Sequence, residues 1–474
     1  MTVELVGVIA LVLGLIGLFL EPAFLVYVFF GATLLGAAAA FVLDSLGGTT
    51  IQPAHLFLGI LTAKLLSRRD VRAGVLGTLS LGSPGFWLLI TAGYAAMSAY
   101  VMPRLFMGQT LVFAVRAEPG SYYAAPLVPT MSNLTQSIYF VGDCVCFLVL
   151  SSFGSTEAGR KCLGRAALMC VVLNLVFAVL DLATYATNTS ELLSFIRNST
   201  YSVLNDNELA GFKRIVGSFV EASSFGYWTL GYFAFATTLW LNGIVARLTL
   251  PLSMLSLLAL LLSTSTTAYV GLAAYLTVLF ATLAFQFVFR PVRPQMIIFL
   301  IGAPFVLCVL VLVICLNDAS YAYVTDLLNT FILNKMSTGS GIERSSWNNQ
   351  AMLNFTDTLG FGAGNGSVRA SSFPVAVIAS LGFLGTAAYV SFLLTIWIRR
   401  IRPAPPTVSA MQSAARSACL AWLIAASASG SFIDLGLPFF AFAALACADV
   451  LGSRAQVSAT RAGIPYRQLS TALD

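Results

Sequence analysis

The chain has 474 residues, of which 58% are hydrophobic and only 9% are charged. Soluble globular proteins carry about 25% charged residues, so the 25 Lys and Arg and the 19 Asp and Glu cannot cover a soluble surface of this size. A soluble enzyme and a disordered protein are therefore excluded. The net charge of +6 comes without a long Lys/Arg cluster, which excludes a nucleic-acid binder. One histidine and eight scattered cysteines argue against a zinc or haem site. The remaining class is an all-α, polytopic integral membrane protein.

Apolar runs long enough to cross a bilayer recur along the whole chain. A membrane-spanning helix needs about 20 apolar residues. The sequence predicts 12 to 14 transmembrane helices that form a single transmembrane domain over residues 1–474. The best division has thirteen runs, at 3–20, 23–43, 52–66, 85–102, 137–153, 164–185, 222–244, 247–263, 267–289, 295–316, 373–398, 412–430 and 433–451.

Lys and Arg residues gather in the short connections on one side of these runs and in the C-terminal tail. Seventeen of the 25 basic residues lie there. Cytoplasmic loops of membrane proteins carry an excess of Lys and Arg, so we expect these connections and the tail to be cytoplasmic. An odd number of spans then places the N-terminus on the outer side.

Three long loops follow on the opposite side, at 103–136, 186–221 and 317–372. The third is too long to be a structureless connection in a compact protein. Apolar residues around Ile342–Leu359 recur at mixed helical spacings, which predicts one or two short helices in that loop.

A first candidate site closes the 186–221 loop. Arg214 and Glu221 are seven residues apart, so a helix would place both on one face. Glu221 stands where the next apolar run begins, and a carboxylate at a membrane boundary is costly unless it is paired, hydrated or functional. Two interpretations stay open. Arg214 and Glu221 form an ion pair that closes a helix end, or Arg214 holds a phosphate or sugar while Glu221 acts as general base.

A second candidate site ends the largest loop. Four glycines in seven residues, from Gly360 to Gly366, allow backbone N–H groups to converge on an anion, and Arg369 adds a positive charge nearby. The segment fits neither a Rossmann nor a P-loop motif. A plain glycine-rich turn is the alternative, and the residues alone favour it.

Several polar residues interrupt the apolar runs. Ser263–Thr267 joins two runs and predicts a polar helical hairpin with side chains bonded to local backbone. Asp143 and Asp181 lie inside or at the end of predicted spans, and Asp434 lies in a turn between two spans. Such acids indicate a proton path, a partner arginine or packing in the bundle. His55 is interpreted as an interfacial residue.

Taken together, these segments resemble the O-antigen polymerase and ligase superfamily, in particular the Wzy-type polymerases of bacterial surface and secreted polysaccharides. The resemblance covers roughly residues 210–400. It rests on Gly217-Ser-Phe-Val-Glu221-Ala-Ser at the start of a span, the Ser263–Thr267 hairpin, the loop segment around Arg344, Leu359-Gly-Phe-Gly-Ala-Gly-Asn-Gly-Ser367, and Leu381-Gly-Phe-Leu-Gly385.

The resemblance implies an enzyme of the bacterial inner membrane that works on the periplasmic face. Such an enzyme transfers a glycan from an undecaprenyl-diphosphate carrier to a sugar hydroxyl of another lipid-linked repeat unit. The donor already carries its leaving group, so no metal or cofactor is expected. On this reading Arg214 and Arg344 hold the diphosphate and Glu221 is the base. Further substrate contacts would come from Arg197, Gly362, Gly364, Gly366 and Arg369.

The resemblance also implies membrane-lipid contacts, and chain-length regulators or export proteins as partners. The ligases of the superfamily carry a histidine in their large outer loop, and residues 317–372 contain none, which favours a polymerase. Some polymerases have a glycine eleven residues after the loop arginine, whereas Phe355 follows Arg344 at that distance. The alternative from another class is a flippase of lipid-linked oligosaccharides. A transporter more often places charges at mid-bilayer and shows paired repeats.

Overall fold

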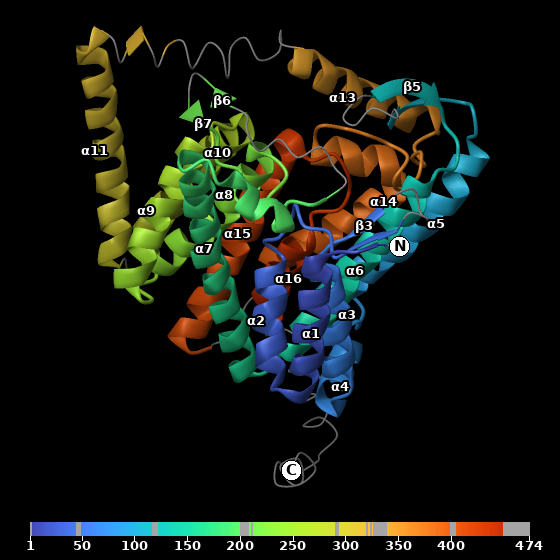
Figure 1. Cartoon of the computed structure of the whole chain (residues 1–474), viewed down its shortest axis with the longest axis horizontal. Helices are drawn as coiled ribbons and strands as arrows, with labels where there is room; N and C mark the ends of the chain where they lie inside the picture. Colours follow the sequence, from blue (N-terminus) through green and yellow to red (C-terminus); the bar gives the residue numbers. More distant parts are fainter. Residues whose placement is uncertain are drawn as a thin grey trace.

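The computed structural model describes residues 2–43, 49–115, 122–199, 208–209, 212–289, 293–318, 321–322, 325, 339–398 and 404–448. These residues are mainly helical, which confirms the predicted all-α class (Figure 1). Each predicted apolar run contains one helix. The helices are α1 Leu5–Phe19, α2 Pro22–Ala32, α3 Pro53–Leu66, α4 Arg69–Thr78, α5 Pro84–Leu105, α6 Met131–Phe153, α7 Glu157–Ala186, η2 Ser190–Ile196, α8 Ala222–Leu241, α9 Ala246–Leu262, α10 Thr266–Phe289, α11 Pro294–Leu316, α13 Gly339–Asp357, α14 Phe373–Ile398, α15 Pro406–Ser429 and α16 Leu437–Cys447.

Six of these helices are long and apolar enough to cross a membrane, namely α5, α6, α7, α10, α11 and α14. Five more apolar helices are shorter, namely α1, α2, α3, α9 and α16. Proline occupies the first turn of several helices, as at Pro53, Pro84 and Pro294. A proline at this position has a backbone angle that suits a helix and lacks an N–H that would be unpaired there.

The six long apolar helices make the chain a multi-pass membrane protein.

Short strands form three small antiparallel sheets. They are β1 Thr2–Val3, β2 Phe41–Leu43 and β3 Thr49–Ile51 in one sheet, β4 Leu111–Val115 with β5 Tyr122–Pro126, and β6 Glu208–Leu209 with β7 Phe212–Lys213. The first sheet corrects one prediction, because the run at 23–43 is not a single span. The helix ends at Ala32, where the Thr33 hydroxyl donates to the Phe30 carbonyl at 2.6 Å, and the run finishes as β2.

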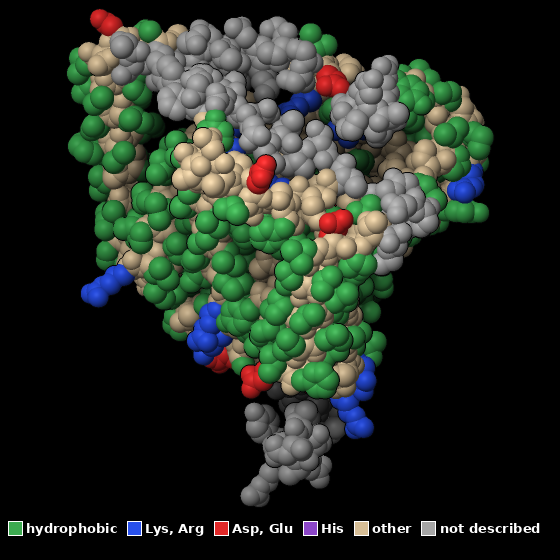
Figure 2. All heavy atoms as spheres, viewed as in Figure 1, with side chains coloured by type: hydrophobic (Ala, Val, Ile, Leu, Met, Phe, Trp, Pro, Cys, Tyr) green, Lys and Arg blue, Asp and Glu red, His purple; other side chains and the backbone are tan. Residues whose placement is uncertain are grey.

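The basic connections gather at one end of the helix bundle. The α8–α9 and α10–α11 connections meet there, because Arg293 donates a hydrogen bond to the Asn242 carbonyl. Glu21, Arg68 and Thr156 line one shared cavity at this end. Figure 2 shows Lys and Arg side chains at this lower end. We call it the basic end, and the opposite end, which carries β5, β6, β7 and α13 in Figure 1, the loop end.

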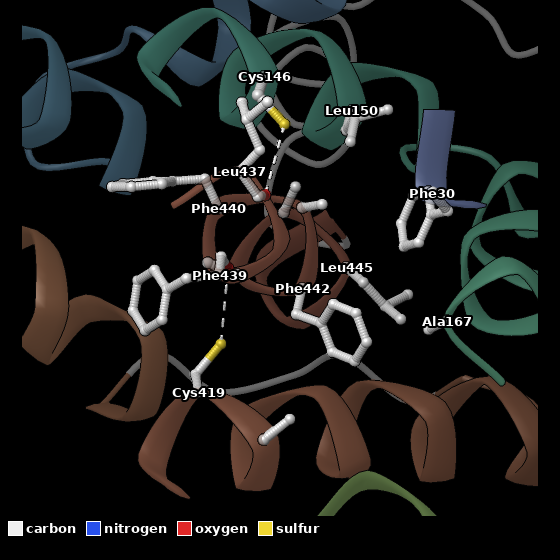
Figure 3. Close-up of a cluster of buried hydrophobic side chains, with 14 of the residues drawn as sticks. Phe30, Cys146, Leu150, Ala167, Cys419, Leu437, Phe439, Phe440, Phe442 and Leu445 are labelled. Atoms are coloured by element: carbon white, nitrogen blue, oxygen red, sulfur yellow. Dashed lines mark hydrogen bonds between the residues drawn. The ribbon is translucent and has the colours of Figure 1, made fainter. Parts of the chain in front are cut away.

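Helix α16 lies at the centre of the bundle, and every one of its residues is buried. It packs between α6 and α15, whose cysteine thiols donate weak hydrogen bonds to its carbonyls (Figure 3). Cys146 reaches the Leu437 carbonyl at 3.9 Å and Cys419 reaches the Phe439 carbonyl at 3.9 Å. This helix is only 11 residues long, so the predicted run at 433–451 becomes a turn followed by a short buried helix.

A compact cap covers part of the loop end. It consists of β4, β5, α13 and residues 358–372, and α13 confirms the helix predicted around Ile342–Leu359. Asn354 on α13 donates to the Thr110 hydroxyl at 2.9 Å, and Thr110 donates to Asp357 at 2.6 Å. We call this unit the cap.

The cap and α14 interlock through two glycine segments. Gly382 interrupts α14 with a φ of 61°, a conformation that glycine adopts without steric cost. The N–H groups of Ala363 and Gly364 donate to α14 carbonyls at 2.9 and 3.1 Å. A Cβ on Gly382 would lie 2.4 Å from the Gly360 carbonyl oxygen. Two motifs that stand apart in the sequence therefore form one packed junction.

The junction predicts a large difference between two glycine-to-alanine variants. Alanine at position 382 has to adopt a φ of 61° with a ψ of −164°, which costs about 1–3 kcal/mol, and its Cβ overpacks the junction, which costs about 1–3 kcal/mol more. Gly93→Ala on α5 is the matched control, because nothing lies within 4 Å of its added Cβ. We expect Gly382→Ala to lower the denaturation midpoint in detergent and Gly93→Ala to leave it unchanged or slightly higher. Equal midpoints for the two variants would contradict the interlock.

Candidate functional site

The segment that leads into α8 carries the first candidate residues. It leaves β7 at Lys213, continues without helix or strand through Arg214 and turns at Gly217, whose φ is 61°. Glu221 then stands at the N-cap of α8 with an extended backbone. The prediction that Arg214 and Glu221 share one helix face is therefore wrong. The chain between them is a turn that needs a glycine, and a helix starts only after Glu221.

Arg214 lies against the tip of the α9–α10 hairpin. Its Nε donates to the Thr264 hydroxyl at 3.1 Å and its Nη2 donates to the Thr264 carbonyl at 3.2 Å. Burial lowers the pKa of Arg214, while the negative charge of Glu221 and the Tyr269 side chain raise it. Arg214 and Glu221 are therefore electrostatic neighbours despite the turn between them. A guanidinium has five N–H donors, and the hairpin tip uses two of them within the described part of the chain.

The hairpin tip has the local polar bonding predicted for it. The Ser263 hydroxyl donates to the Leu260 carbonyl at 2.7 Å, and the Ser265 hydroxyl accepts the Ala268 N–H at 3.4 Å. Thr264 sits between them in the left-handed region, with a φ of 46°. Thr264, the residue with the strained backbone, is the one that accepts the hydrogen bonds of Arg214. The sequence did not indicate this contact.

Glu221 is half-buried beside this arginine. The Ser223 hydroxyl donates to its Oε1, and its backbone carbonyl accepts the Phe225 N–H at 3.1 Å. A carboxylate held by a single hydroxyl keeps most of its acceptor capacity, since it offers about four lone-pair positions. The Arg214, Glu221 and Thr264 group is called the hairpin cluster below.

A buried ion network binds the segment that carries Arg214 of the hairpin cluster. Asp181 lies near the end of α7. Its Oδ1 forms ion pairs with Arg197 Nη2 at 2.7 Å and with Lys213 Nζ at 3.6 Å. Its Oδ2 accepts the backbone N–H groups of Val216 at 2.7 Å and Gly217 at 3.0 Å. The Asp181 and Arg197 side chains are 1% and 2% exposed. Of the interpretations left open for Asp181, the partner arginine is the one the structure bears out.

Arg197 is therefore enclosed in protein. Besides its bond to Asp181, its Nε donates to the Gly217 carbonyl at 3.1 Å. This geometry gives Arg197 a structural role, whereas the resemblance implied that it contacts the substrate. Lys213 was missed by sequence reasoning, although a carboxylate at the end of an apolar run was a signal that a basic partner exists.

A second group of basic residues lies in the cap. The Arg369 guanidinium stands 3.9 Å from the Tyr122 ring centre and 4.2 Å from the Trp347 ring centre, a cation–π arrangement on two sides. Burial lowers the pKa of Arg369, the positive charge of Arg344 lowers it further, and Tyr122 and Glu343 raise it. Arg344 and Arg369 are therefore electrostatic neighbours, whereas the resemblance grouped Arg344 with Arg214. We call this group the cap cluster.

The predicted glycine contacts have a packing explanation. A Cβ on Gly362 would lie 2.6 Å from the Gly382 nitrogen, and one on Gly364 would lie 2.6 Å from the Ser98 carbonyl oxygen. A Cβ on Gly366 would lie 2.5 Å from a carbonyl oxygen of α6. All three have a positive φ. The close approach of the turn to α5, α6 and α14 accounts for these glycines, so phosphate binding by them stays a prediction.

The candidate charged residues thus fall into the hairpin cluster and the cap cluster, except for Arg197, which belongs to the Asp181 network. Among the described residues, no hydrogen bond or ion pair joins the two clusters. Within the same residues, no group of three His, Cys, Asp or Glu side chains is placed to hold a metal ion. Comparison of the chain with protein-family models, with curated proteins and with solved structures finds no match.

The buried network predicts a strong effect of one charge removal. Asp181→Asn removes the carboxylate that Arg197 contacts inside the protein, and breaking a buried ion pair costs about 3–5 kcal/mol. The matched control is Asp70→Asn, which removes the exposed pair that Asp70 forms with Arg68 at 2.7 Å. An exposed pair contributes about 0–1 kcal/mol. Denaturant titration of both variants in detergent measures the difference, and equal stabilities would show that the network does not hold this end together.

Proposed function

We propose that the chain is a polysaccharide polymerase of the Wzy type, a metal-independent membrane glycosyltransferase. The observation that carries the proposal is the hairpin cluster. It sets a guanidinium beside a carboxylate at the loop end of a membrane bundle. A departing diphosphate needs the first of these groups and an attacking hydroxyl needs the second.

The proposed reaction requires no group beyond the two substrates and the side chains. The acceptor hydroxyl oxygen forms a bond to the anomeric carbon of the donor glycan. The bond from that carbon to the diphosphate oxygen breaks, and its electron pair leaves with undecaprenyl diphosphate. Glu221 takes the hydroxyl proton, and Arg214 neutralises the departing diphosphate through charge-assisted hydrogen bonds. Arg214 has donors to spare for this contact within the described residues.

The cap cluster is the proposed second contact to anionic substrate. Arg344 is half-buried beside Arg369, so two positive charges lie together at the surface of the cap. Like charges this close repel each other, and an anion between them relieves the repulsion. Arg369 is already held by two aromatic rings, which leaves Arg344 as the residue proposed to touch the substrate.

The proposed setting follows from the reaction. The loop end would face the periplasm, and the membrane would be the bacterial inner membrane, where undecaprenyl-diphosphate carriers are available. The one-sided position of the basic connections supports this orientation, since such residues mark the cytoplasmic side. Chain-length regulators or export proteins are the proposed protein partners.

Purified protein in lipid vesicles, supplied with synthetic undecaprenyl-diphosphate repeat units and no nucleotide sugar, tests the proposal. We expect chain growth from the wild type. Glu221→Gln should slow growth by about 10²–10⁴-fold, the usual contribution of a general base. Arg214→Ala should also abolish polymer, and Arg214→Lys should keep part of the rate because it keeps the charge but not the planar fork.

Arg104→Ala is the control for this assay, because Arg104 lies at the end of α5 and contacts only its own turn at Tyr100 in the described residues. Full-length polymer from Glu221→Gln would remove Glu221 from the base role. No polymer from the wild type would refute the polymerase.

One observation favours the alternative class, a flippase of lipid-linked oligosaccharides. Asp143 is 1% exposed in the middle of α6, and buried acids inside a bundle are common along transport paths. The same vesicles separate the functions. Movement of labelled repeat units across the bilayer without chain growth would support the flippase. Transfer to a lipid A core acceptor without polymer would support the ligase.

A further inference from the structure

A pair of carboxyl groups, one buried and one half-buried, lies outside both clusters. Asp143 stands in the middle of α6 and is 1% exposed. Its Oδ2 atom is buried and has no hydrogen-bond donor among the described residues. The described chain also places no Lys or Arg against Asp143, whereas Asp181 has two such partners. A buried carboxylate oxygen without a donor, on a side chain without a neighbouring cation, is costly inside a bundle.

Asp434 lies in the turn between α15 and α16. The turn is anchored on both sides of Asp434. The Tyr389 hydroxyl of α14 donates to the Ile433 carbonyl at 3.0 Å, and the Cys146 thiol of α6 reaches the Leu437 carbonyl at 3.9 Å. Cys146 follows Asp143 by three residues, so this contact brings the turn to the same stretch of α6.

The contacts of the turn with α6 and α14 set the Asp434 carboxyl beside that of Asp143, and the two groups act on each other electrostatically. Two ionised carboxylates cannot hydrogen bond, because each offers only acceptors. A bond between them therefore requires one proton. That proton also removes the repulsion between two like charges in a medium that screens poorly, as in other carboxyl pairs that share a proton. Asp434 accepts the Gly436 N–H at 2.5 Å on Oδ1, which leaves its other oxygen for the shared proton.

The other titratable groups that face the pair are uncharged in their ordinary states. Tyr227 from α8 and Tyr389 from α14 act electrostatically on Asp434, and Cys144 and Cys146 are neighbours on α6. None of these groups supplies a positive charge that could replace the proton.

His55 from α3 is the remaining neighbour. A Cβ on Gly142 would lie 3.9 Å from its Cδ2, and its ring stands 5.0 Å from the Tyr139 ring. Its Nδ1 atom is buried without a hydrogen-bond partner within the described chain, and Asp434 acts on it electrostatically. The Tyr139 hydroxyl donates to the Thr50 carbonyl of β3 at 2.8 Å. A row of polar groups thus leads from the pair toward β3.

We propose that Asp143 and Asp434 form a proton-binding site that holds one exchangeable proton between their carboxyl groups. The ligand is the proton, and His55 and Tyr139 mark the side from which it exchanges. Occupancy of the site joins the α15–α16 turn to α6, and loss of the proton sets two negative charges against each other. This site does not depend on the proposed polymerase activity, because neither carboxyl belongs to the hairpin or cap cluster.

Labelling with dicyclohexylcarbodiimide tests the site in the intact protein in lipid vesicles. A protonated carboxyl transfers its proton to a carbodiimide nitrogen while its oxygen adds to the carbodiimide carbon, and the adduct rearranges to a stable acylurea. We expect mass spectrometry to find this adduct on Asp143 or Asp434, with a yield that falls as the pH rises. Exposed Asp70, ionised and paired with Arg68, should stay unlabelled.

Three outcomes decide the proposal. Asp143→Asn should abolish labelling of Asp434 as well, because the shared proton is lost with its partner, while Asp70→Asn should change nothing. If the Asp143→Asn protein misfolds, labelling of the wild-type protein across the pH range still decides the proposal. Absence of the adduct on both residues across the whole pH range would overturn the proposal. Protection by Na⁺ at constant pH would overturn it in favour of a metal-cation site.

Discussion

The Asp181 carboxylate is the interaction on which the loop end of the molecule depends. A bilayer offers no water to stabilise a charge, so a carboxylate at the end of a span has to be matched inside the protein. Asp181 is matched by two cations and two backbone N–H groups. The segment that supplies three of these four partners also carries Arg214 in its middle. An ion network that satisfies one buried charge therefore also determines where the candidate arginine stands.

The rest of the loop end is held by close backbone contact instead of charge. The glycine turn of the cap approaches α5, α6 and α14 so closely that side chains have no room, and the kink at Gly382 completes the fit. Membrane bundles often use small residues in this way, because burying apolar surface gains little when the solvent is lipid. The cap thus presents Arg344 and Arg369 on a rigid base, while the hairpin cluster rests on the Asp181 network.

The helices could be predicted from the sequence, because about twenty apolar residues in a row leave few alternatives in a membrane. The helix in the largest loop was also predictable from its periodicity. The run at 23–43 was not, since β2 depends on pairing with β1 and β3, which apolar content does not reveal. The shared helix face of Arg214 and Glu221 failed because Gly217 turns the chain between them.

Long-range partners were beyond the sequence for the same physical reason. The acid at Asp181 indicated a basic partner, but the three long loops contain eight Lys and Arg residues, and only the fold selects Arg197 and Lys213. The proposed pairing of Asp143 with Asp434 joins α6 to the turn between α15 and α16. A single sequence contains no signal that brings those two residues together.

Hydrogen exchange of the segment 212–221 tests the central claim most directly. The Val216 and Gly217 amides donate to Asp181, and hydrogen bonds to a charged group contribute about 1.5–3 kcal/mol. In the Asp181→Asn protein we predict that peptides covering this segment exchange at least about tenfold faster than in the wild type. Peptides of the cap turn around Gly362 should exchange at the same rate in both proteins. Unchanged exchange over 212–221 would contradict the claim that Asp181 holds the arginine-bearing segment in place.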